Sequence, residues 1–165
     1  MNETPGSVEL GHAHIFVRAL DRATGFYTKV VGLREIERIG DALAFLSSSQ
    51  KHHTLALQAL GETAGPPMPG TVGLYHVAFE LPDAAALDDA LDRLDAETVA
   101  WQAVDHGISW AVYFDDPDGN GLELYVDRRD HPGGRKEWRG ATTTLPRERI
   151  RKAAETKASW RGSRS

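Results

Sequence analysis

Alternating apolar and polar residues divide the chain into two stretches that share one order of elements. The strands of the first stretch are expected near residues 12–17, 33–39, 42–47 and 54–59. Those of the second are expected near residues 75–81, 98–102, 110–114 and 122–126. A helix capped by Asp21 and ended by Gly32 follows the first strand, and a helix opened by Pro82-Asp83 follows the fifth. Each stretch therefore reads βαβββ, and the chain is predicted to be α+β.

A linker rich in glycine and proline, residues 61–72, separates the two predicted modules. Module 1 covers about residues 9–60, module 2 about 73–128, and a basic C-terminal extension covers 129–165. The extension shows no periodic pattern until Pro146, which predicts a short helix to about Lys157, with frayed residues after it.

The composition narrows the class of protein. A chain of 165 residues with 41% hydrophobic content can form one compact domain from the two modules. No apolar run approaches the roughly 20 residues of a membrane span, and Met1–Val8 lacks the features of an export signal. We therefore expect a soluble, cytoplasmic protein. Because the chain has no cysteine, a bound metal must use nitrogen and oxygen ligands.

The formal net charge of −5 is unevenly distributed. Residues 131–165 carry ten Lys or Arg and three Glu, a net charge of +7, which leaves −12 for the remainder. A basic tail alone does not indicate nucleic-acid binding, since an acidic body repels phosphate. We expect the tail to pack on its own acidic body or on a partner subunit.

The doubled pattern resembles the vicinal oxygen chelate superfamily over residues 9–128, with Gly11-His12 leading into a strand and Phe26-Tyr27 before Val31-Gly32-Leu33. This resemblance implies paired βαβββ modules that form a cup-shaped mixed sheet around a divalent metal. The superfamily's four ligand positions map to His12, Ala56, His76 and Glu123. Because the second is alanine, the implied metal ligands are His12, His76 and Glu123, the set of extradiol dioxygenases.

A second motif supports the dioxygenase branch. The run from Val104 to Glu123 contains Val-Asp-His, Val-Tyr, Asp-Pro, Gly and Glu at the signature spacing of extradiol dioxygenases. By that resemblance, His53 is the acid–base histidine, His106 lines the O2 and substrate side, and Tyr113 hydrogen-bonds the catecholate oxygen. Histidine titrates in the range that such proton transfers require.

The resulting hypothesis is an extradiol dioxygenase with Fe2+, or Mn2+ on the same ligands, and O2 as co-substrate. It would open a catechol-type ring to a muconic semialdehyde-type product, and it could act as a homodimer or higher homo-oligomer. The catechol and the regiochemistry stay open. The alternatives are a glyoxalase-like metal-dependent isomerase or lyase, and a metal-free drug-binding resistance protein of the same fold.

Several other polar residues receive simpler interpretations. His14 shares the face of His12 but is expected to be a non-ligand. His52 is expected to point away from His53, because neighbouring residues of a strand alternate. The acidic run Asp115–Asp118 is interpreted as part of a tight turn rather than a calcium site. Trp101 and Trp110 are expected to pack in the core, and His131 receives no role.

Overall fold

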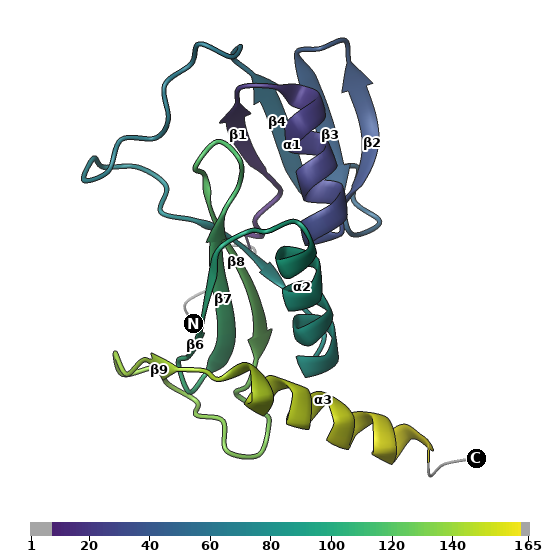
Figure 1. Cartoon of the computed structure of the whole chain (residues 1–165), viewed down its shortest axis with the longest axis vertical. Helices are drawn as coiled ribbons and strands as arrows, with labels where there is room; N and C mark the ends of the chain where they lie inside the picture. Colours follow the sequence, from purple (N-terminus) through teal and green to yellow (C-terminus); the bar gives the residue numbers. More distant parts are fainter. Residues whose placement is uncertain (1–7, 163–165) are drawn as a thin grey trace, which may run out of the picture. The chain divides into compact units, whose positions relative to one another are not determined.

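The computed structural model describes residues 8–162, with side chains described as far as Thr156 (Figure 1). Residues 1–7 of the segment Met1–Val8 lie outside the described range. Of the residues after Lys157 that were expected to fray, the last three lie outside it as well. The chain forms two compact units, residues 1–28 with 32–64 and residues 29–31 with 65–165. No helix among the described residues is long and apolar enough to cross a membrane.

The first unit holds a four-stranded sheet in the order β1-β4-β3-β2. Its elements are β1 (Ala13–Val17), α1 (Leu20–Phe26), the π-helical turn η1 (Tyr27–Val31), β2 (Arg34–Ile39), β3 (Leu43–Ser47) and β4 (Leu55–Ala59). The alternation predicted for β1 is confirmed, because Ile15 and Val17 are buried while His14 and Phe16 are exposed. Helix α1 contacts β4 and β3.

The expected helix cap at Asp21 is wrong by two residues, because the cap position is Ala19. Helix α1 begins at Leu20 after Ala19, and Asp21 lies inside its first turn. The Asp21 carboxylate instead accepts a hydrogen bond from Arg38 at 2.6 Å. The predicted end at Gly32 is confirmed, since this glycine adopts a φ of 89°, which residues with a side chain rarely adopt.

The second unit holds a five-stranded sheet in the order β5-β8-β7-β6-β9, with α2 packed against β8 (Figure 1). Its elements are β5 (Val77–Glu80), α2 (Ala84–Ala96), β6 (Trp101–Asp105), β7 (Ser109–Asp115), β8 (Gly121–Asp127), β9 (Thr143–Thr144) and α3 (Arg147–Gly162). The predicted cap of α2 is confirmed, because Asp83 accepts a hydrogen bond from the Ala86 N–H at 3.0 Å.

Strand β6 begins three residues later than expected. The residues after α2 form a helix-ending turn, in which Thr98 has a φ of 56° and the Val99 N–H donates to the Leu94 carbonyl at 2.9 Å. These residues therefore cannot join the strand, and β6 continues to Asp105 instead. The predicted α+β class with two βαβββ modules is confirmed.

Strand register establishes which residues of the two modules are equivalent. In the first module Ala56 pairs with His14 on the parallel strand, and in the second Glu123 pairs with Ala78. Each partner lies two residues after a histidine, His12 or His76. The antiparallel neighbours correspond as well, because Phe45 lies opposite Ala56 and Tyr113 lies opposite Glu123. The registers therefore make His12 equivalent to His76 and Ala56 equivalent to Glu123, as the four ligand positions of the superfamily require.

The basic extension packs on acidic residues of the second unit, as expected. Strand β9 pairs with β6, helix α3 packs along α2, and Leu145 and Ile150 are buried. The Arg147 guanidinium binds three α2 carboxylates, those of Asp88 at 3.1 Å, Asp95 at 2.5 Å and Asp92. The helix runs to Gly162, five residues beyond the predicted end.

Replacing Arg147 by Gln is expected to lower the free energy of unfolding by about 1–2 kcal/mol, since its side chain is only 17% exposed and serves three carboxylates. The matched control is Arg151→Gln, because Arg151 is 53% exposed and lies 3.5 Å from Asp88. We expect the control to change the unfolding free energy by less than about 0.5 kcal/mol. Urea unfolding at low and high salt measures both. Equal effects of the two variants would contradict this role for Arg147.

Candidate functional site

One face of the second sheet carries a row of polar side chains. Tyr113 on β7 pairs across the sheet with Gln102 on β6 and with Glu123 on β8. Their sequence neighbours, such as Phe114 and Leu122, project to the opposite face and are buried. Alternation along three adjacent strands therefore gathers these three polar groups on one face.

Glu123 and His76 form the centre of this face. His76 lies immediately before β5, and its Nε2 is 2.9 Å from Glu123 Oε2. Glu123 is only 8% exposed, whereas most glutamates are solvated. The other ring nitrogen of His76, Nδ1, is buried and has no hydrogen-bond partner among the described residues. Imidazole and carboxylate donors thus converge at a largely desolvated point.

A chain of hydrogen bonds extends from Glu123 along the face. The Tyr113 hydroxyl donates to Glu123 Oε1 at 3.2 Å and lies 3.0 Å from His106 Nε2. His106 Nδ1 in turn lies 2.9 Å from the Thr142 hydroxyl oxygen. Burial, followed by the charge of Glu123, raises the pKa of Tyr113 to about 12. Tyr113 is therefore a protonated donor at neutral pH in the metal-free protein.

A tight turn between β6 and β7 presents His106 to this chain. The turn requires Gly107, whose φ is 79°. Asp105 accepts a hydrogen bond from the Gly107 N–H at 2.7 Å, and the His106 N–H donates to the Ser109 carbonyl at 3.0 Å. The Asp-His-Gly sequence thus fixes the backbone from which the imidazole projects.

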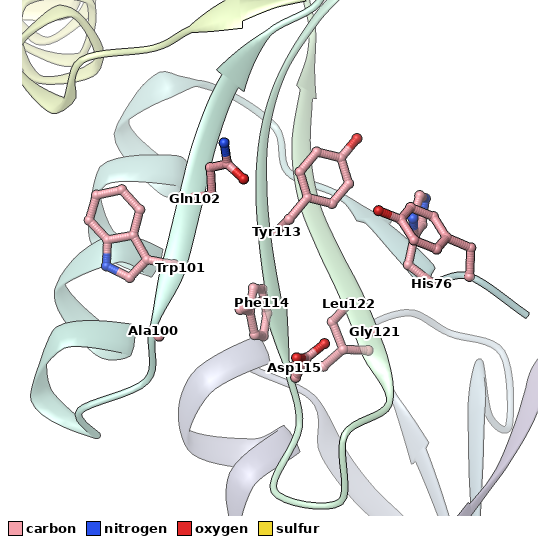
Figure 2. A pocket seen from close by; sticks show the side chains of 10 residues that line it. His76, Ala100, Trp101, Gln102, Tyr113, Phe114, Asp115, Gly121 and Leu122 are labelled. Carbon is pink, nitrogen blue, oxygen red and sulfur yellow. The ribbon is translucent and has the colours of Figure 1, made fainter. Parts of the chain in front are cut away.

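A cavity of about 310 Å³ is lined by His76, Gln102 and Tyr113 of this face, and Figure 2 shows these side chains and Trp101 around it. Trp101 therefore borders a cavity, and the expectation that it packs in the core is wrong. Its indole N–H donates to Asp95 at 2.8 Å. Trp110 does pack in the core, under the guanidinium of Arg128, whose Cζ lies 4.1 Å from the ring centre.

In the first unit, His12 and His53 lie together. Their ring centres are 4.5 Å apart, and the ring of Phe45 lies 5.0 Å from that of His53. Burial, followed by the nearby imidazoles of His12, His52 and His14, lowers the pKa of His53. The His53 imidazole is therefore uncharged at neutral pH and can accept a proton.

The expectation that His52 points away from His53 is wrong. Both residues lie in the loop before β4, which begins only at Leu55, so the alternation of a strand does not apply. The two Nδ1 atoms are 2.9 Å apart, and His52 Nε2 contacts Glu37 at 3.0 Å. His52 thus links His53 to a carboxylate.

The acidic run after β7 forms a turn, as expected. The buried Asp116 carboxylate accepts hydrogen bonds from the Asp118 N–H at 2.8 Å and the Asn120 N–H at 2.9 Å. Gly119 has a φ of 88° at the tip. This carboxylate therefore serves the backbone of the β7–β8 turn.

The predicted residues fall into two groups, one in each unit. His76, Glu123, Tyr113 and His106 form a continuous set in the second unit, and His12 and His53 a pair in the first. No set of three His, Asp or Glu side chains within the described range is clustered as a metal site. The ligand set of His12, His76 and Glu123 stays a prediction.

Sequence reasoning missed two residues of the extension. Thr142 contacts His106, and the Trp138 ring packs edge-on against the His106 ring with 5.5 Å between ring centres. No motif marks either residue, because the signature that located His106 ends at Glu123.

The family model for the Glyoxalase/Bleomycin resistance protein/Dioxygenase superfamily matches residues 9–124. The chain belongs to this superfamily. A solved superfamily domain from Frankia sp. EAN1pec has the same fold, with a TM-score of 0.65 and 24% identity over 76% of this chain and 96% of that one. A lactoylglutathione lyase from Agrobacterium tumefaciens gives a TM-score of 0.57 and 25% identity over 79% of this chain and all of that one.

Curated relatives within the superfamily carry dioxygenase names. The chain is 38% identical to a catechol-2,3-dioxygenase of Bacillus subtilis (strain 168), over 72% of this chain and 41% of that protein. It is 33% identical to biphenyl-2,3-diol 1,2-dioxygenase 3 of Rhodococcus globerulus, over 77% of this chain and 66% of that protein. It thus spans less than two thirds of either relative.

Two side chains of the second unit have the spacing that ligands of one divalent metal would need. Two donors that share one metal at right angles, each about 2.1 Å from it, lie roughly 3 Å apart. His76 Nε2 and Glu123 Oε2 are 2.9 Å apart. One nitrogen and one carboxylate oxygen suit ferrous iron or manganese, and the absence of cysteine removes the softer alternatives.

Proposed function

We propose that this protein is an extradiol dioxygenase that opens a catechol-type ring with both atoms of O2. The observation that carries this proposal is the contact between His76 and Glu123, two side chains that can bind a metal. Glu123 is also hydrogen-bonded to Tyr113, which in turn contacts His106. The 38% identity to a catechol-2,3-dioxygenase supports the same reaction class. A muconic semialdehyde-type acid would be the product.

The proposed ligands of Fe2+, or of Mn2+, are His12, His76 and Glu123. His12 is included among the ligands because it holds the position in the first module that His76 holds in the second. Ala56 has no donor atom at the position equivalent to Glu123. Two imidazoles and one carboxylate leave adjacent coordination positions open, so the bound metal would supply a meeting point for a bidentate catechol and O2.

Tyr113 and His106 would bind the substrate oxygen beside the ligand pair. The Tyr113 phenol remains protonated because its pKa is raised to about 12, so it can donate to a deprotonated catechol oxygen. The His106 imidazole holds the phenol at 3.0 Å from its Nε2 and limits its rotation. When the substrate binds, the Tyr113 hydroxyl would turn its single proton from Glu123 Oε1 to the substrate oxygen, where it would stabilise negative charge.

His53 would move the protons of the substrate. A catechol must lose protons from its hydroxyl groups to bind through both oxygens, and a neutral imidazole can accept one. The lowered pKa of His53 keeps this imidazole unprotonated at neutral pH. The same nitrogen could then return the proton later in the reaction.

Anaerobic loading with Fe2+, followed by oxygen-electrode and absorbance assays, tests the proposal. The panel contains catechol, methylcatechols, dihydroxybiphenyl, homoprotocatechuate and DOPA. We expect one O2 consumed per ring opened and a yellow product with at least one member. Bound iron with no O2 uptake across the panel would contradict the proposal and favour a glyoxalase-like lyase. Failure to bind any divalent metal would favour a drug-binding protein of the same fold.

A further inference from the structure

We infer that the C-terminal extension completes the site, with Thr142 as a positioning residue that holds His106 in one proton arrangement. The family model ends at residue 124, so the extension lies outside the pattern shared by the superfamily. The effect of Thr142 on catalysis rests on the proposed function, whereas its effect on the proton arrangement of His106 is independent of that function.

With a neutral His106 imidazole, the hydrogen bonds from Thr142 through His106 and Tyr113 to Glu123 have only one consistent direction. An ionised carboxylate can only accept hydrogen bonds, so the Tyr113 hydroxyl donates its single proton to the hydrogen bond with Glu123. The phenol oxygen must then accept from His106, which places the proton on His106 Nε2. In the neutral imidazole Nδ1 is then a bare acceptor, and the Thr142 hydroxyl donates to it across 2.9 Å. Thr142 is thus the first donor of a chain that ends at Glu123.

Trp138 restricts the same imidazole from a second side. The two rings pack edge-to-face, with an interplanar angle of 83° and 5.5 Å between centres. The indole N–H donates to the Ala141 carbonyl at 2.9 Å, which fixes the indole in place. A ring held by one hydrogen bond at each nitrogen and by an aromatic contact has little freedom to rotate.

The backbone of the extension places both residues. Strand β9 follows Thr142 directly and pairs with β6, the strand that ends at Asp105 just before His106. The Arg135 N–H also donates to the Gly107 carbonyl at 2.8 Å. The extension is therefore bonded to the turn of His106 on both sides of Trp138 in sequence.

The test is nitrogen NMR of the histidine rings in the metal-free full chain, for the wild type and three variants. The variants are Thr142→Val, which removes only the hydroxyl, Thr142→Ser, which restores it, and Thr143→Val as the matched control. The His106 signals are assigned by their loss in His106→Gln. We expect wild-type His106 to carry its proton on Nε2, with Nδ1 shifted as an acceptor of a hydrogen bond.

In Thr142→Val we expect the Nδ1 resonance to move toward that of an acceptor bonded only to water, because this contact is exposed. We expect recovery in the Ser variant and no change in the control. In the iron-loaded enzyme kcat should fall roughly three- to tenfold while KM changes less than about twofold. A protonated Nδ1 in the wild type, or identical His106 spectra in all variants, would overturn the inference. If the expected spectra appear but no catechol is cleaved, the proposed function fails and the positioning role stands.

Discussion

Replacing Glu123 by Gln is expected to weaken Fe2+ binding by at least about 100-fold and to remove ring cleavage. Changes to residues that only support a ligand already cost about 10- to 100-fold in metal affinity, and Glu123 is proposed as a ligand itself. The amide keeps the size of the side chain but loses the negative charge that faces His76 Nε2 at 2.9 Å. Anaerobic competition with a ferrous chelator measures the affinity.

Glu80→Gln is the matched control. Glu80 lies on β5 of the same sheet and accepts a hydrogen bond from Tyr125 at 3.1 Å, much as Glu123 accepts one from Tyr113. Neither Glu80 nor Tyr125 is a proposed metal ligand. We expect the control to bind iron as the wild type does. Stoichiometric iron in Glu123→Gln would remove Glu123 from the ligand set.

Replacing His53 by Phe is expected to lower kcat by about 10²- to 10⁴-fold, the usual contribution of a positioned acid–base group. Iron affinity should change little, since His53 is not a proposed ligand. Steady-state rates and iron content measure the two effects separately. Undiminished turnover would remove His53 from proton transfer.

The pH dependence of the rate separates His53 further from a structural role. Because burial and the neighbouring imidazoles lower the pKa of His53, its imidazole gains a proton only below the usual histidine range. The wild-type rate should therefore rise as the pH increases through this lowered pKa and level off above it. This limb should be absent from His53→Phe. His52→Phe should keep the limb but move it toward higher pH, because the neighbouring His52 imidazole lowers the pKa of His53.

The sequence was sufficient to predict the paired modules because each module repeats its apolar alternation. The signature also singled out Tyr113 and Glu123, which pair across adjacent strands, and the superfamily's ligand positions singled out His76, which contacts Glu123. His12 and His53 were singled out only by the resemblance to the family, and the first unit brings their rings together.

Local interactions that have no period in the sequence were not predictable. Asp21 has the residue type of a helix cap, but the nearby guanidinium of Arg38 binds it instead. His52 and His53 lie in a loop whose backbone does not alternate. Thr142 reaches His106 only because β9 pairs with a strand about forty residues earlier, and contacts of that range leave no local pattern.

The pairing of β9 with β6 also bears on where the folded domain ends. Without the extension, β6 would be an edge strand with unpaired backbone groups, a template for association with another chain. Loss of the buried side chains of Leu145 and Ile150 would also expose the apolar surface that they cover in the second unit, including that of α2. A chain cut at the limit of the shared family pattern would therefore be prone to aggregate, and the smallest stable domain of this protein is longer than that pattern.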